Sequence, residues 1–175
     1  IVNYEDRGEG IKYADIIIND MYPSDKYKEF KNVYIGTDYT CMRRDLILYS
    51  AKEFNSVPKK LIITFGGSDP CNYTKRVLDL ILDKKINEQI EVVFILGLGY
   101  KFDNEIVRHK SKNIKVFKNV KNMASILRKG DIAITSNGRT LLELAYFEIP
   151  CISLAQNDRE STHVHAKLEN GIIFL

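Results

Sequence analysis

Two short stretches of the sequence carry groups that could bind an anion or a nucleotide. The first is GGSDP at residues 66–70, which follows the apolar run LIITF at 61–65. Glycine permits positive φ and a close approach by a ligand, while Asp69 and Pro70 suit the start of a helix. The pattern predicts a strand, a tight turn and a helix whose free N–H groups can hold an anion. A turn that only connects the two elements explains this motif equally well.

The second stretch is SNGRTLLE at residues 136–143. Ser136, Asn137 and Gly138 form another small-residue turn at a predicted helix start, and Thr140 and Glu143 stand three residues apart. Backbone amides there would hold a diphosphate, and the Glu143 carboxylate would accept from ribose hydroxyls. A capping box between Thr140 and Glu143 would need no ligand. The pairing with a second glycine turn at the same sheet edge favours a nucleotide site.

The elements that must position these turns alternate along the chain. Strands followed by helices of ordinary length indicate βαβ units, a parallel sheet and helices on both faces. The sequence therefore predicts an α/β fold with a doubly wound, Rossmann-like parallel sheet. The predicted strands are 61–65, 90–96, 114–117, 132–135, 151–154 and 172–175, and the predicted helices are 43–54, 70–83, 103–110, 122–129 (closed by Gly130 as a C-cap), 140–147 and 159–169.

Ligands of such sheets bind outside the carboxyl ends of the strands. The loops predicted at that edge begin at residues 66, 97, 118, 136 and 155, and most are rich in Gly, Ser, Asn, Thr or charge. Their convergence on one edge is stronger evidence for a site than any single loop.

The first 40 or so residues differ, with two predicted strands at 13–18 and 32–35, many tyrosines and little helix. We interpret residues 1–42 as the remnant of a preceding N-terminal domain and a linker, and residues 43–175 as the binding domain. The chain starts at Ile1 and stops inside the apolar run GIIFL, so we expect it to be a piece of a larger protein.

Composition narrows the class of protein. The 175 residues are 45% hydrophobic and 28% charged with a net charge of +3, which is too mild to indicate nucleic acid binding. Three scattered cysteines without a CxxC motif argue against zinc and for a reducing cytoplasm. No apolar run is long enough for membrane insertion, and the sequence calls for no metal or cofactor.

Several motifs resemble a known family. FGGSDP, SNGRTLLE and CISLAQNDREST are similar to the C-terminal half of the UDP-sugar hydrolase of pseudaminic acid biosynthesis and its spore-coat polysaccharide relatives. YIGTDYTCMRRDLI resembles that family's linker pattern, with Gly36, Tyr39 and Arg43 in register. The resemblance implies a two-domain glycosyltransferase-B architecture in which the C-terminal domain holds most of a UDP-sugar ligand.

Site residues follow from this resemblance position by position. It implies diphosphate contacts from two turns, ribose contact from Glu143, main-chain contact with uracil around Val120, and a segment near the sugar beginning at Asn157. Arg139 departs from the family's small residue, and it either pairs with phosphate or lies on the surface. For Asn157 and Glu160, an N-cap with its capping-box partner is the alternative. The implied binding residues are Gly66, Gly67, Ser68, Val120, Ser136, Asn137, Gly138, Arg139, Thr140, Glu143, Asn157, Glu160 and Ser161.

The resemblance implies hydrolysis of a UDP-2,4-diacetamido-type deoxy sugar in nonulosonic acid or surface polysaccharide biosynthesis. The family's catalytic histidine belongs to a Gly-His loop of the N-terminal domain, and no such loop occurs here. His163 and His165 fall two apart in a predicted helix and His109 in a charged helix, so we expect none to be the base; Asn157 is a candidate contributor. We expect the chain to bind UDP without hydrolysing a UDP-sugar by itself. A UDP-glycosyltransferase domain and a non-catalytic binding module are the alternatives.

Overall fold

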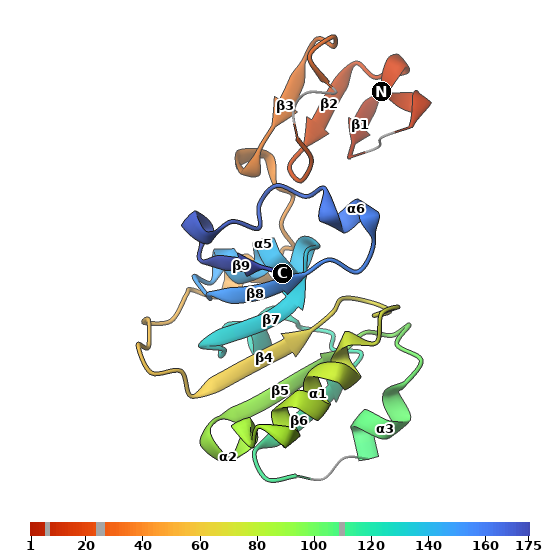
Figure 1. The fold of residues 1–175 in the computed structure, drawn as a ribbon. Coiled ribbons are helices and arrows are strands. Elements are labelled where there is room, and N and C mark those ends of the chain that lie inside the picture. The colour runs from red at the N-terminus through yellow and green to blue at the C-terminus, as the bar shows by residue number, and fades with distance from the viewer. Residues whose placement is uncertain (6–7, 24–26, 109–110) are drawn as a thin grey trace.

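The computed structural model describes residues 1–5, 8–23, 27–108 and 111–175, so His109 lies outside the described residues. Two parallel sheets follow one another along the chain (Figure 1). The first contains three strands in the order β1-β2-β3, namely β1 (Val2–Tyr4), β2 (Ile16–Asn19) and β3 (Val33–Ile35). The sequence predicted the last two of these strands but missed β1.

The second sheet has six parallel strands in the order β6-β5-β4-β7-β8-β9. From the centre of the sheet, β4, β5 and β6 follow one another toward one edge, and β7, β8 and β9 follow one another toward the other edge. This order confirms the predicted doubly wound topology. The strands are β4 (Lys60–Thr64), β5 (Glu91–Leu96), β6 (Ile114–Lys118), β7 (Ile132–Ser136), β8 (Cys151–Leu154) and β9 (Ile172–Phe174).

Helices cover both faces of this sheet, as the crossover rule requires. The helices are α1 (Tyr73–Asp83), α2 (Ile86–Gln89), α3 (Asp103–Arg108), α4 (Ala124–Leu127), α5 (Arg139–Tyr146) and α6 (Asp158–Ser161). Alternate strand residues face opposite layers: Ile62 packs with α4 and α5, whereas Leu61 and Ile63 pack with α1 and α3. Both layers are apolar, which explains the almost continuously apolar sequences of β4 and β5.

The helix predicted at residues 43–54 is wrong. Only a 3₁₀ turn, Leu46–Leu48, forms in this segment, and it places Leu46 in the core under α5. Ile47, Leu48 and Phe54 remain exposed, so the apolar residues do not share one buried helical stripe. The segment runs as an extended connection between the two sheets (Figure 1).

The helix predicted at residues 159–169 is also wrong beyond its first turn. It ends at Ser161, and only the 3₁₀ turn Leu168–Asn170 follows before β9. The backbone N–H of Val164 donates to the carbonyl of Met21 at 3.0 Å, in the first part of the chain. This tertiary hydrogen bond replaces the intrahelical one, so His163 and His165 do not lie on a helix.

The start of α1 and the role of Gly130 differ from the sequence prediction. Helix α1 begins at Tyr73 rather than at Pro70, although the Asp69 carboxylate still caps it by accepting from the N–H groups of Tyr73 (2.9 Å) and Thr74 (2.7 Å). Gly130 is not a left-handed C-cap. Its missing side chain leaves room for Ile62, whose Cγ1 would lie 2.6 Å from a Cβ at that position.

Candidate functional site

A cleft of about 240 Å³ opens at the carboxyl ends of the central strands of the second sheet. It lies beside β4, where the strand order reverses, which is the ligand position expected for a doubly wound sheet. Loops after three strands, helix α5 and the connecting segment supply its walls, which are formed by Arg43, Thr64, Gly66, Ile95, Leu96, Gly97, Leu98, Asn119, Val120, Met123, Thr140 and Glu143.

Glycines let two loops of this cleft pack backbone against backbone. Gly66 has a φ of +72°, and the N–H of Gly99 donates to the carbonyl of Gly67 at 2.9 Å. A Cβ on Gly97 would lie 2.3 Å from the Gly67 carbonyl oxygen and 2.4 Å from that of Gly66. The GLG stretch at 97–99 is the signal that could have placed Gly97 and Leu98 among the candidate residues.

The predicted binding residues fall into separate groups. Gly66, Val120, Thr140 and Glu143 line the cleft, while Gly67 and Ser68 are exposed on its first turn. Gly138, Arg139, Asn157 and Glu160 instead line a second pocket of about 260 Å³, together with Glu5, Met21, Arg159 and His163. Ser136 and Asn137 are buried between the two, and Ser161 is exposed and lines neither.

Glu143 presents a carboxylate from α5 to the cleft. The residue is only 9% exposed, and burial raises the pKa of its carboxyl group. The Arg43 guanidinium, with Nη1 4.0 Å from Glu143 Oε1, opposes that shift. Helix α5 has Gly138 as its N-cap and no side-chain cap, so the Thr140–Glu143 capping box does not form. The carboxylate is therefore available to a ligand.

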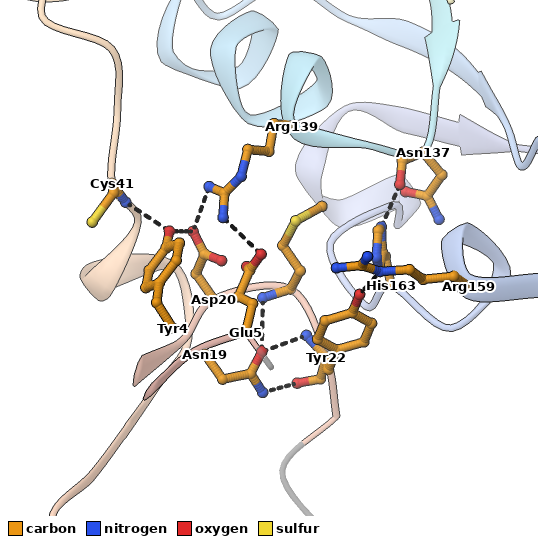
Figure 2. Close-up of polar contacts among 11 residues, drawn as sticks. Tyr4, Glu5, Asn19, Asp20, Tyr22, Cys41, Asn137, Arg139, Arg159 and His163 are labelled. Carbon is orange, nitrogen blue, oxygen red and sulfur yellow. Dashed lines mark hydrogen bonds and ion pairs between the residues drawn. The ribbon is translucent and has the colours of Figure 1, made fainter. Parts of the chain in front are cut away.

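Arg139 lies on the surface, which is one of the two arrangements considered from the sequence, and it also pairs with carboxylates of the first sheet. Its guanidinium donates to Glu5 Oε2 at 2.7 Å and Asp20 Oδ2 at 3.5 Å, and it lies over the Tyr4 ring at 5.0 Å (Figure 2). Glu5 and Asp20 directly follow β1 and β2, so this cluster joins the strand ends of the first sheet to the start of α5.

The structure contains the N-cap of the alternative for Asn157 but not the capping box with Glu160. Asn157 Oδ1 accepts from the Glu160 N–H at 2.9 Å, as an N-cap of α6 should. Glu160 does not return the bond to Asn157 but accepts from the Gln156 backbone N–H at 2.9 Å and from Gln156 Nε2 at 3.4 Å. Both side chains thus shape the wall of the second pocket.

Comparison with known proteins agrees with this geometry. The model of the glycosyltransferase family 28 C-terminal domain matches residues 61–168. The chain belongs to this family. The uncharacterised protein MJ1062 of Methanocaldococcus jannaschii is 35% identical over 84% of the chain and 33% of that protein. The spore coat polysaccharide biosynthesis protein SpsG of Bacillus subtilis is 24% identical over 98% of the chain and 53% of that protein. The chain thus spans between a third and about half of these relatives.

His163 of the family 28 domain lies beside the second pocket with its ring held in place. It lines the second pocket, its Nδ1 donates to the Asn137 carbonyl, and it packs edge-on against Tyr22 (Figure 2). Burial lowers the pKa of the imidazole, which favours the neutral form. The Asn137 carbonyl therefore orients the His163 imidazole.

Other site classes find no support in the part of the chain that the structure describes. Its residues contain no cluster of His, Cys, Asp and Glu side chains that could hold a metal ion. Within the same described ranges, no helix is sufficiently long and apolar to cross a bilayer.

The cluster around Arg139 predicts a pH-dependent stability. Burial and the neighbouring Asp20 raise the pKa of Glu5 to about 7, above that of the unfolded chain. The protonated form is therefore favoured on folding, and its stabilisation is lost as the pH rises through about 7. Between pH 6 and pH 8 we expect the free energy of unfolding to fall by about 1 kcal/mol from this group.

Urea unfolding at both pH values measures this loss, and Glu5→Gln should remove it. The exposed Glu169 provides the matched control, because Glu169→Gln leaves the cluster intact. An equal fall in wild type and Glu5→Gln would contradict the assignment.

Proposed function

We propose that this chain holds the nucleotide of a UDP-sugar in an enzyme that hydrolyses the bond between sugar and diphosphate in surface polysaccharide or nonulosonic acid biosynthesis. The observation that carries the proposal is the cleft at the switch point, where the glycine loops at Gly66 and Gly97 meet the Glu143 carboxylate, which caps no helix. SpsG, a similar protein, bears a name that refers to spore coat polysaccharide.

Each wall of the cleft suits one part of the nucleotide. The turn at Gly66 and the first turn of α5, where Thr140 lines the cleft, offer backbone N–H groups to the diphosphate, and the start of α5 adds the positive end of its dipole. Glu143 accepts from the ribose hydroxyls, and the main chain at Asn119 and Val120 faces the uracil edge.

These groups would assist the departure of UDP. Negative charge grows on the diphosphate as its bond to the sugar breaks, and preorganised N–H groups stabilise that charge. Water supplies the hydroxyl of the sugar product, and a general base must accept its proton. We place that base outside this nucleotide cleft, whose walls contain no histidine among the described residues.

Transfer to an acceptor hydroxyl is the second candidate, because the family is named for glycosyltransferases. The longer protein would distinguish the two reactions. UDP release from a UDP-2,4-diacetamido sugar with water alone indicates hydrolysis, whereas release that requires an added acceptor indicates transfer.

Calorimetry with UDP, CMP, ADP and inorganic phosphate tests nucleotide binding by the chain itself. We expect UDP to bind at least about tenfold more tightly than the other three, a difference of about 1.4 kcal/mol. The reason is that only UDP presents the uracil edge, the ribose and the diphosphate together. No measurable heat of binding with UDP, or equal affinity for all four ligands, would contradict the proposal.

A further inference from the structure

The connecting segment that precedes the second sheet contributes an arginine to the nucleotide cleft. Arg43 lines the cleft together with Glu143, although it lies outside residues 61–168, which the family model matches. The Arg43 side chain is 45% exposed and that of Glu143 11%, so a ligand in the cleft can reach both. The guanidinium therefore stands beside the same part of the ligand as the carboxylate.

The backbone around Arg43 is fixed on both sides. Met42 packs against the cluster that contains Leu142 of α5, and Leu46 is buried in the core with 1% exposure. The Leu46 N–H donates to the Arg43 carbonyl at 3.1 Å and closes the turn between them. The arginine is therefore held at a defined position beside α5, although most of the connecting segment is extended.

Asp45 fixes the orientation of the guanidinium. Its Oδ1 accepts from Arg43 Nε at 3.0 Å, and its Oδ2 accepts from Arg43 Nη2 at 2.9 Å. Asp45 directly precedes the 3₁₀ turn Leu46–Leu48, but its side chain does not cap that turn. A bidentate carboxylate holds the planar guanidinium in one orientation, and here the third nitrogen, Nη1, faces Glu143.

The gap between Arg43 and Glu143 fits one hydroxyl group. Arg43 Nη1 lies 4.0 Å from Glu143 Oε1, which is too far for a direct hydrogen bond. A hydroxyl oxygen about 2.8 Å from each atom would accept from Nη1 and donate to Oε1. A donor and an acceptor at this spacing recognise both properties of a hydroxyl at once.

We propose that Arg43 and Glu143 select ribose over deoxyribose by holding one ribose hydroxyl between them, and that Asp45 positions Arg43 for this contact. Arg43 is then a ligand-binding residue and Asp45 a positioning residue. A ligand without the hydroxyl leaves the guanidinium N–H and the carboxylate without their shared partner, which costs affinity. The inference rests on the proposed function, since the ribose must lie beside Glu143.

Calorimetry with UDP, 2′-deoxy-UDP and 3′-deoxy-UDP tests the bridge. The analogue that lacks the bridging hydroxyl should bind at least about tenfold more weakly than UDP. Arg43→Gln should weaken UDP binding by a similar factor and leave the affinity for that analogue nearly unchanged, which also shows that the variant folds. Arg44→Gln is the matched control, because it removes the same charge from the adjacent exposed residue and should keep the discrimination.

Asp45→Asn separates positioning from charge. The substitution removes a negative charge near a cleft that binds an anion, so charge alone predicts tighter binding of UDP. If Asp45 positions Arg43, UDP should instead bind at least about threefold more weakly, and the discrimination against the same deoxy analogue should shrink.

Three results would overturn the inference and leave nucleotide binding intact. They are equal affinity of the wild type for all three nucleotides, equal losses for all three in Arg43→Gln, and tighter binding of UDP by Asp45→Asn. If the wild type does not bind UDP at all, this inference and the proposed function both fail.

Discussion

Gly97→Ala should reduce the free energy of unfolding by about 3 kcal/mol, at the upper end of the cost of overpacking, and lower UDP affinity by at least about tenfold. The added Cβ would lie 2.3 and 2.4 Å from two backbone carbonyl oxygens, at Gly67 and Gly66. Backbone cannot move aside as a flexible side chain can, so both turns of the cleft must separate. Urea unfolding and calorimetry with UDP measure the two losses.

Gly67→Ala is the matched control for this substitution. Gly67 lies in the same turn, but its φ is not positive and a Cβ there meets nothing within 4 Å. We expect its stability to stay within about 0.5 kcal/mol of wild type, as for an ordinary surface substitution. Equal behaviour of the two alanine variants would show that the close approach of the loops does not shape the cleft.

Glu143→Gln should weaken UDP binding by about 1–3 kcal/mol, the scale of a hydrogen bond to a charged group. The carboxylate accepts two ribose hydroxyls in the proposed complex, whereas an amide offers only one acceptor oxygen. The thermal midpoint should not fall, since removing a buried charge whose pKa burial raises relieves a desolvation cost. Thermal denaturation and calorimetry on the same preparation separate the two quantities.

Glu148→Gln serves as the control, because Glu148 is exposed at the far end of α5. It should leave both the midpoint and UDP affinity unchanged. A lower midpoint for Glu143→Gln, with unchanged affinity per folded molecule, would assign the residue to folding rather than to binding.

The sequence predicted the second sheet well because the information is local there. The central strands β4 and β5 are short apolar runs with turn residues at their ends, and packing between two helical layers makes both of their faces apolar. The two glycine turns and Glu143 could be placed at one edge for the same reason, since parallel strands present their carboxyl ends together. Whether the candidate residues bind a nucleotide stays a prediction, as does the division of the chain at residue 42.

The failures fall where distant segments meet. Residues 43–54 have helix-forming composition, but Leu46 alone is drawn into the core and the rest forms an extended connection. After Ser161 the hydrogen bond from Val164 to Met21 replaces the next helical turn. Neither partner is visible in a window of the sequence around the segment it alters.

The sequence by itself therefore determined the fold class and the edge of the sheet at which the cleft opens, because hydrophobic period, turn chemistry and strand polarity are local properties. Only the tertiary structure decided that Arg139 pairs with Glu5 and Asp20, that His163 is oriented by Asn137, and that Gly97 packs on Gly66 and Gly67. The physical reason is distance along the chain. The side chains that meet in these contacts lie between 26 and 134 residues apart along the chain, and no local pattern encodes that meeting.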